Sequence, residues 1–141
     1  MGKISVVYWS QSGNTLAMAE AIGKGITDGG AQAEVVNVSS CQVSDLDTEE
    51  VFALGCPAMG AEVLEESEME PFVAELEGNV KGKKIALFGS YGWGDGQWMR
   101  DWEKDCDDAG INLVCESVIC CETPDDAALE ACRAMGKALA E

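Results

Sequence analysis

Short apolar runs and helical patterns alternate along the whole chain. Five runs rich in β-branched or aromatic residues have the length and composition of strands. They lie at residues 4–7, 33–38, 51–56, 83–89 and 112–120. Apolar residues recur at helical spacing from Leu16 to Ile26, before Gly29 and Gly30, and again over residues 67–76, 98–109 and 127–139. The alternation predicts a series of strand and helix units.

Such a series is typical of an α/β fold, in which helices cover both faces of a parallel sheet. The fourth strand, residues 83–89, is almost wholly apolar, as a central parallel strand would be. Residues 45–50 are polar and predict a connection. Sheets of this kind bind ligands beyond the carboxyl ends of their strands. A site is therefore expected at the turns after the first, third and fourth strands.

The length and composition of the chain fit one folded domain over residues 1–141. No apolar run approaches membrane-spanning length, and no secretory signal precedes the first strand. Seven cysteines form no CxxC pair, and no histidine completes a common zinc set. We therefore expect free thiols in a reducing cytoplasm, with the adjacent Cys120 and Cys121 as the pair most sensitive to oxidation.

Acidic residues outnumber basic residues by 26 to 9, which gives a net charge of −17. This balance argues against binding to nucleic acid or to an anionic membrane, and it favours partners with basic surfaces. The alternative is that the acidity only maintains solubility. Charge alone does not specify a function.

The turn after the first strand has the composition of an anion site. Ser10, Ser12, Asn14 and Thr15 offer side-chain donors, while Gly13 allows the backbone to curl toward an anion at a helix N-terminus. The turn contains no Lys or Arg, no Gly-Lys-Ser/Thr and no set of three spaced glycines, so a nucleoside triphosphate or NAD is disfavoured. The turn instead fits a monophosphate ester held by neutral donors and the helix dipole.

The other two turns combine glycines with aromatic residues. They span residues 56–62 and 89–98, and the second contains four glycines and two tryptophans. Because Trp is costly to expose and Gly is costly to order, these turns suggest a flat ligand, with core packing as the alternative for Trp93. Trp98 and Trp102, four residues apart on a helix, are expected in the core or on a partner surface, and Trp9 is expected to be structural.

The three turn sequences resemble those of the short-chain flavodoxins of the clostridial, FMN-binding type. The matching segments are Ser-Gln-Ser-Gly-Asn-Thr after the first strand, Ala-Met-Gly-Ala-Glu after the third and Gly-Ser-Tyr-Gly-Trp-Gly after the fourth. The resemblance extends over the whole chain. It implies a flavodoxin-like, doubly wound sheet of five parallel strands in the order 2-1-3-4-5, and FMN as the cofactor.

The resemblance also implies a role for each site residue. The FMN phosphate would be held by Ser10, Gln11, Ser12, Gly13, Asn14 and Thr15. Met59 and Trp93 would lie on opposite faces of the isoalloxazine ring, and Glu62 would accept a hydrogen bond from flavin N3–H. The ribityl chain and the ring edge would be lined, largely by backbone groups, by Pro57, Ala58, Ser90, Tyr91, Gly92 and Gly94.

Gly60 has a separate predicted role in redox chemistry. It occupies the first central position of the turn over residues 59–62, where a type II′ turn requires the positive φ that Gly adopts at little cost. We hypothesise that the Gly60–Ala61 peptide flips on reduction and presents the Gly60 carbonyl to flavin N5–H, as in the resembled family. The mechanism depends on Gly60.

The implied function is that of a low-potential one-electron carrier whose FMN shuttles between semiquinone and hydroquinone. We expect a cytoplasmic monomer that acts between reductases and ferredoxin-using enzymes with basic surfaces. It is not expected to be an enzyme, because the sequence offers neither a general base beside a substrate pocket nor an NAD(P)H-binding region.

Two other functions are compatible with this class of fold. An FMN-dependent NAD(P)H quinone or nitro reductase is the main alternative, although such proteins tend to carry an insertion that this chain lacks. A phospho-acceptor receiver domain needs an acidic pair after the first strand and an Asp after the third. Trp9-Ser10 and Cys56-Pro57 stand at those places, which argues against the receiver domain.

Overall fold

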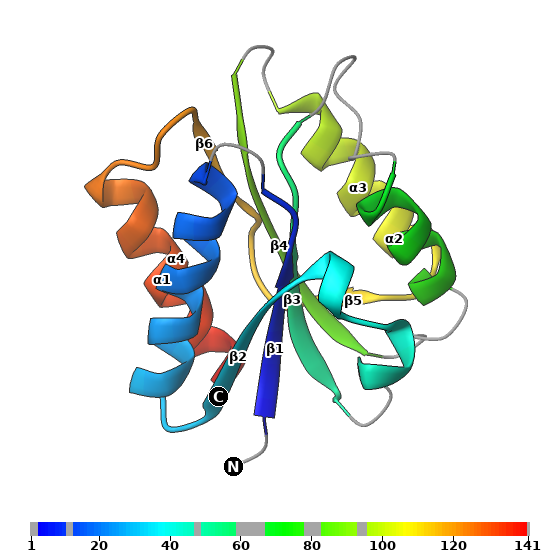
Figure 1. The fold of residues 1–141 in the computed structure, drawn as a ribbon, viewed down its shortest axis with the longest axis horizontal. Helices are drawn as coiled ribbons and strands as arrows, with labels where there is room; N and C mark the ends of the chain where they lie inside the picture. Colours follow the sequence, from blue (N-terminus) through cyan, green and yellow to red (C-terminus); the bar gives the residue numbers. More distant parts are fainter. Residues whose placement is uncertain are drawn as a thin grey trace.

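The computed structural model describes residues 3–10, 13–46, 49–58, 67–77, 83–92 and 96–140. Figure 1 shows a central sheet with a helical layer on each side. The strands are β1 (Lys3–Tyr8), β2 (Gln32–Asn37), β3 (Val51–Gly55), β4 (Lys84–Tyr91), β5 (Asn112–Leu113) and β6 (Val118–Cys121). The helices are α1 (Asn14–Asp28), α2 (Met69–Glu77), α3 (Gln97–Asp108) and α4 (Asp126–Ala140), with short 3₁₀ turns η1 (Val38–Ser40) and η2 (Val43–Leu46).

The described strands pair only in parallel, in the order β2-β1-β3-β4-β5, with β6 also paired to β4. This order confirms the predicted doubly wound sheet. The central strands β1, β3 and β4 are buried over most of their length, whereas no residue of β2 at the edge is buried. The difference follows from position, because helices cover a central parallel strand on both faces.

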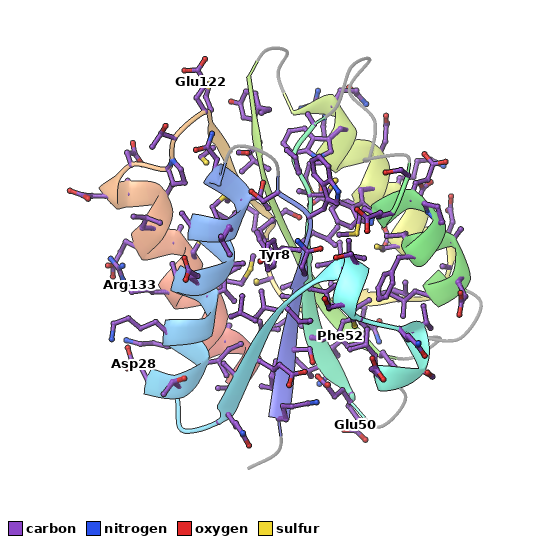
Figure 2. All side chains as sticks on the ribbon, viewed as in Figure 1. Tyr8, Asp28, Glu50, Phe52, Glu122 and Arg133 are labelled. Atoms are coloured by element: carbon purple, nitrogen blue, oxygen red, sulfur yellow. The ribbon has the colours of Figure 1, made fainter. Side chains whose placement is uncertain are left out.

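Each face of the sheet packs against its own pair of helices. Figure 1 shows α1 and α4 on one side, with α2 and α3 on the other, and Figure 2 shows side chains filling both layers. Met18, Ile22 and Cys132 belong to the buried group under α1 and α4. Phe72 and Trp102 belong to the buried group under α2 and α3. The predicted helices are confirmed, with their ends displaced by at most two residues.

The strand predicted over residues 112–120 is divided in two, which corrects the sequence-based expectation. β5 ends at its pair with Ile85 of β4, and β6 begins at its pair with Phe88. Between these pairs β4 advances three residues, whereas the edge strand advances five, from Leu113 to Val118. Two extra residues therefore bulge out of the ladder, as is common at sheet edges.

A buried carboxylate closes the amino end of the sheet. The pairing of β1 with β3 begins at Val6, one residue beyond Ser5. Glu49, which is 6% exposed, accepts hydrogen bonds from the Ser5 N–H and from the Ser5 hydroxyl, each at 2.7 Å. Lys83 Nζ donates to the carbonyls of Leu46 and Glu49. Side chains thus satisfy backbone groups where the ladder between β1 and β3 has not yet started.

Helices α1 and α4 approach so closely that two glycines are required at their contact. A Cβ at Gly25 of α1 would collide with the backbone carbonyl of Arg133 in α4. A Cβ at Gly136 of α4 would collide with the carbonyl of Ile22 in α1. Backbone cannot turn aside as a flexible side chain can, so the two helices would have to separate to admit a methyl group.

We expect Gly25→Ala to lower the free energy of unfolding by about 1 to 3 kcal/mol through this collision. The loss should appear although Ala is the better helix former by about 1 kcal/mol. Gly23→Ala in the same helix is the matched control, because its Cβ would meet side chains and no backbone: Cγ2 of the exposed Val35 at 2.8 Å and Cβ of Ala33 at an ordinary 3.8 Å. Urea unfolding of both variants measures the difference. Equal midpoints would contradict the proposed packing.

Candidate functional site

The carboxyl ends of β1, β3 and β4 lie side by side at one edge of the sheet, at the top of the view in Figure 1. Three backbone hydrogen bonds join them: Trp9 N–H to Gly55 O at 3.0 Å, Cys56 N–H to Phe88 O at 3.2 Å and Ala58 N–H to Ser90 O at 3.0 Å. Doubly wound sheets bind ligands at this edge. The structure thus brings together the described residues that lead into the three turns singled out by the sequence.

A serine hydroxyl shapes the turn after β1. Ser10 Oγ accepts a hydrogen bond from the Gly13 N–H at 3.1 Å and a longer one from the Leu16 N–H at 3.4 Å. Gly13 has a φ of 93°, a backbone conformation that residues with a Cβ rarely adopt. The chain therefore turns sharply at Gly13 and enters α1 at Asn14.

The N-terminus of α1 offers an electropositive site without a cation. Its first turn carries no acidic side chain, and the described residues of the preceding turn include no Lys or Arg. The helix dipole and the first backbone N–H groups favour an anion at such a place. The geometry fits the monophosphate site predicted from the turn sequence.

Two buried hydroxyls connect the start of α1 to the end of β4. Thr15 is 1% exposed and Ser90 is 4% exposed. Their oxygens lie 3.3 Å apart, and either hydroxyl can be the donor. The contact joins elements separated by 75 residues in sequence, so it fixes the first turn against the third.

Trp98 has a role that the sequence did not reveal. It is 1% exposed, so of its two expected places the core is correct. Its Nε1–H also donates to the carbonyl of Cys56 at 3.2 Å, and its ring packs at 51° against Tyr91, with 5.6 Å between ring centroids. Trp98 therefore contacts both Cys56, which directly follows β3, and Tyr91, the last residue of β4.

Trp9 similarly anchors the first turn. Its side chain is half-buried, and Nε1–H donates to Glu68 Oε1 at 3.2 Å, just before α2. The contact supports the structural role expected for Trp9. Neither tryptophan bond has a local sequence signal, because each partner lies more than 40 residues away.

The structure describes nine of the predicted cofactor-binding residues and places them at this edge of the sheet. They are Ser10, Gly13, Asn14, Thr15, Pro57, Ala58, Ser90, Tyr91 and Gly92. The other predicted residues lie outside the described part of the chain: Gln11, Ser12, Met59, Gly60, Glu62, Trp93 and Gly94.

The described residues fit the phosphate group of a cofactor such as FMN. A Cβ built on Gly13 or on Gly92 would meet no atom of the described residues within 4 Å. The described donors of the first turn are hydroxyls, an amide and backbone N–H groups, all of them neutral. This donor set suits an anionic phosphate ester, which the start of α1 stabilises electrostatically.

The neighbouring cysteines differ in exposure. Burial raises the pKa of the Cys120 thiol to about 11, with smaller contributions from Asp125 and Cys121. A thiol with this pKa stays protonated at neutral pH and is a poor nucleophile. Cys121 is exposed, so of this pair it is the more accessible to oxidants.

Within residues 3–140, apart from the gaps given above, no group of three or more Cys, Asp or Glu side chains could hold a metal ion. None of the helices in this part of the chain is both long and apolar enough to cross a membrane.

Comparison with known proteins identifies the family. The family model described as Flavodoxin matches residues 6–136. The flavodoxin of Clostridium beijerinckii is 48% identical over 137 residues, which cover 97% of this chain and 99% of that protein. The flavodoxin of Megasphaera elsdenii is 43% identical over 138 residues, which cover 98% of each.

Solved structures agree with the sequence comparison. The two-electron reduced flavodoxin of Megasphaera elsdenii superposes with a TM-score of 0.88 at 44% identity, over 99% of this chain and 98% of that one. An archaeal flavodoxin superposes with a TM-score of 0.86 at 33% identity, over 99% of this chain and 96% of that one. Because the family model, the two relatives and the superposed structures match over nearly its whole length, the chain belongs to the flavodoxin family.

Proposed function

We propose that this flavodoxin carries electrons one at a time on FMN, with the phosphate at the first turn and the ring between the second and third. Flavodoxins are small FMN-binding electron carriers, and close relatives bear that name. Bound FMN supplies the one-electron chemistry. The observation that carries the proposal is the set of backbone hydrogen bonds that aligns the three turns.

The phosphate is assigned to the start of α1. Ser10 holds the turn by accepting from two backbone N–H groups, and Gly13 directs the chain into the helix. Thr15 contributes a hydroxyl that the contact with Ser90 already orients. The predicted roles of Gln11 and Ser12 complete this donor set.

The ring is assigned to the space between the turns after β3 and β4. Met59 directly follows Ala58, whose N–H bonds to Ser90, and Trp93 directly follows Gly92 on the neighbouring turn. This adjacency supports Met59 and Trp93 as the two faces of the ring site. An indole stacked on an electron-poor flavin would contribute about 1 kcal/mol, by analogy with other aromatic pairs.

Negative charge is proposed to lower the potential of the carrier. One carboxylate about 12 Å from the ring, in water-like surroundings, opposes an added electron by roughly 0.3 kcal/mol, and salt weakens the effect. Several of the 26 acidic residues together could lower the second one-electron potential by tens of millivolts. A neutral phosphate site leaves this repulsion uncompensated.

The same charge indicates the partners. A net charge of −17 favours redox proteins with basic surfaces, namely reductases and ferredoxin-using enzymes, and opposes self-association, which supports a monomer. The seven cysteines are free thiols, which supports a cytoplasmic setting. The relatives at 43% and 48% identity are named flavodoxins, so an electron-transfer protein is favoured over a quinone or nitro reductase.

Removal of one buried hydroxyl tests the phosphate site. We expect Thr15→Val to weaken FMN binding by roughly tenfold, the loss expected for one hydrogen bond to a charged group. Thr27→Val is the matched control in the same helix, because the Thr27 hydroxyl donates to the Gly23 carbonyl far from the three turns. Quenching of FMN fluorescence on addition of apoprotein measures both affinities. If the two variants bound FMN equally well, the assignment of Thr15 would be wrong.

Substitution of the turn glycine tests the redox role of Gly60. We expect Gly60→Thr to lower the first one-electron potential of bound FMN by about 40 to 90 mV, because a β-branched residue opposes positive φ and strains the hydrogen bond of the Gly60 carbonyl. Gly60→Ala should lower the potential by a smaller amount. A spectroelectrochemical titration gives both values, and potentials equal to those of the unmodified protein would refute the peptide flip.

A further inference from the structure

A groove of about 780 Å³ lies between β6 and α4. Figure 1 shows these two elements next to each other, on the side of the sheet that α1 and α4 cover. One wall of the groove includes Val118 and Ile119 of β6. The other wall includes Ala127, Ala131 and Ala134 of α4.

The walls of the groove are apolar although the chain is strongly charged. Ala127, Ala131 and Ala134 are exposed, and Ile119, with 37% exposure, is one of two large hydrophobic side chains exposed in the described part of the chain. With Ala138, the alanines recur at spacings of four, three and four residues, so they form a ridge along one side of α4. A ridge of methyl groups allows another helix to approach closely.

The charges at the groove have one sign. Among the described residues that line it, Glu116 and Asp125 are acidic, and none is Lys or Arg. Both carboxylates belong to exposed residues. The groove therefore complements a partner surface that has a central apolar stripe with cationic side chains on either side of it.

The groove is also connected to the turn after β4. Tyr91 lines it, and the N–H of Glu122 donates to the Tyr91 carbonyl at 2.7 Å. Glu122 has a positive φ of 59° and projects outward at the carboxyl edge of the sheet (Figure 2). Ile119 Cδ1 would lie 2.9 Å from a Cβ on Gly96, the residue directly before α3. Residues of the groove thus contact both ends of the turn that is assigned to the flavin ring.

We propose that this groove docks an amphipathic helix of a redox partner. The apolar side of the helix would lie on Ile119 and the alanine ridge, and its Lys and Arg residues would face Glu116 and Asp125. The inference rests on the proposed function, because it names the partner surface that a carrier of this charge would recognise. A second copy of the chain is disfavoured as the occupant, since two chains of −17 repel each other. At 15 residues, α4 can support about four turns of the partner helix.

The test uses the FMN-loaded protein and a synthetic 15-residue helical peptide with Leu on one face and Lys on the other. The same peptide with Glu in place of Lys is the charge control. Titrations followed by ¹H–¹⁵N NMR should shift residues 118–121 and 127–138. Ala131→Arg, which adds bulk and positive charge to the groove, should weaken the Lys peptide at least tenfold. Ala74→Arg makes the same change at an exposed alanine of α2 and should leave the affinity within twofold.

Several results would overturn the proposal. Equal weakening by Ala131→Arg and Ala74→Arg would show only general charge attraction, and shifts confined to other helices would place the peptide elsewhere. Absence of binding, or equal binding of the Glu peptide, would also contradict the proposal. Self-association that Ala131→Arg abolishes would assign the groove to a second copy. Visible absorbance reports FMN separately, so loss of the carrier function and loss of docking are distinguishable.

Discussion

The register of β3 between β1 and β4 is the constraint on which the site depends. Tyr8 pairs with Gly55, and Gly55 pairs with Phe88, so the carboxyl ends of the three strands are aligned across the sheet. The hydrogen bonds from Trp9 and Cys56 continue this alignment into the turns. A slip of one residue would exchange the two faces of a strand, so the apolar layers on both sides of the sheet also preserve the alignment of the turns.

A second constraint is electrostatic. A chain with a net charge of −17 has to hold a phosphate, which is itself an anion. At the proposed phosphate site, the start of α1 would hold it with neutral donors and backbone dipoles, without a cation beside the cofactor. A Lys in the first turn would bind the phosphate more strongly. It would also offset the negative charge that is proposed to lower the reduction potential of the cofactor.

The main elements and the turns could be predicted because their signals are local. Apolar residues spaced as in Leu16 to Ile26 mark a helix, and Gly13 marks the sharp turn before it. The bulge after Leu113 could not be predicted, because it depends on how many residues β4 offers opposite the edge strand. The Ser5 and Glu49 contact was also beyond sequence reasoning, since its partners lie 44 residues apart.

The candidate site shows the same division. Turn composition predicts an anion site at Ser10 to Thr15, which stays a prediction, and the structure adds how Ser10 and Gly13 shape the entry into α1. The hydrogen bond from Trp98 to the Cys56 carbonyl was not predicted, because the sequence of a helix does not indicate which distant carbonyl an indole N–H will contact. Supporting residues of this kind follow from the fold and become visible only once the strands are in register.

The visible spectrum of the purified chain tests the central claim most directly, namely that the three aligned turns bind FMN. The account predicts a yellow protein that holds about one FMN per chain, as one built cofactor site requires. It also predicts that stepwise reduction passes through a blue, half-reduced form. A colourless protein that takes up no FMN when the cofactor is added would contradict the account.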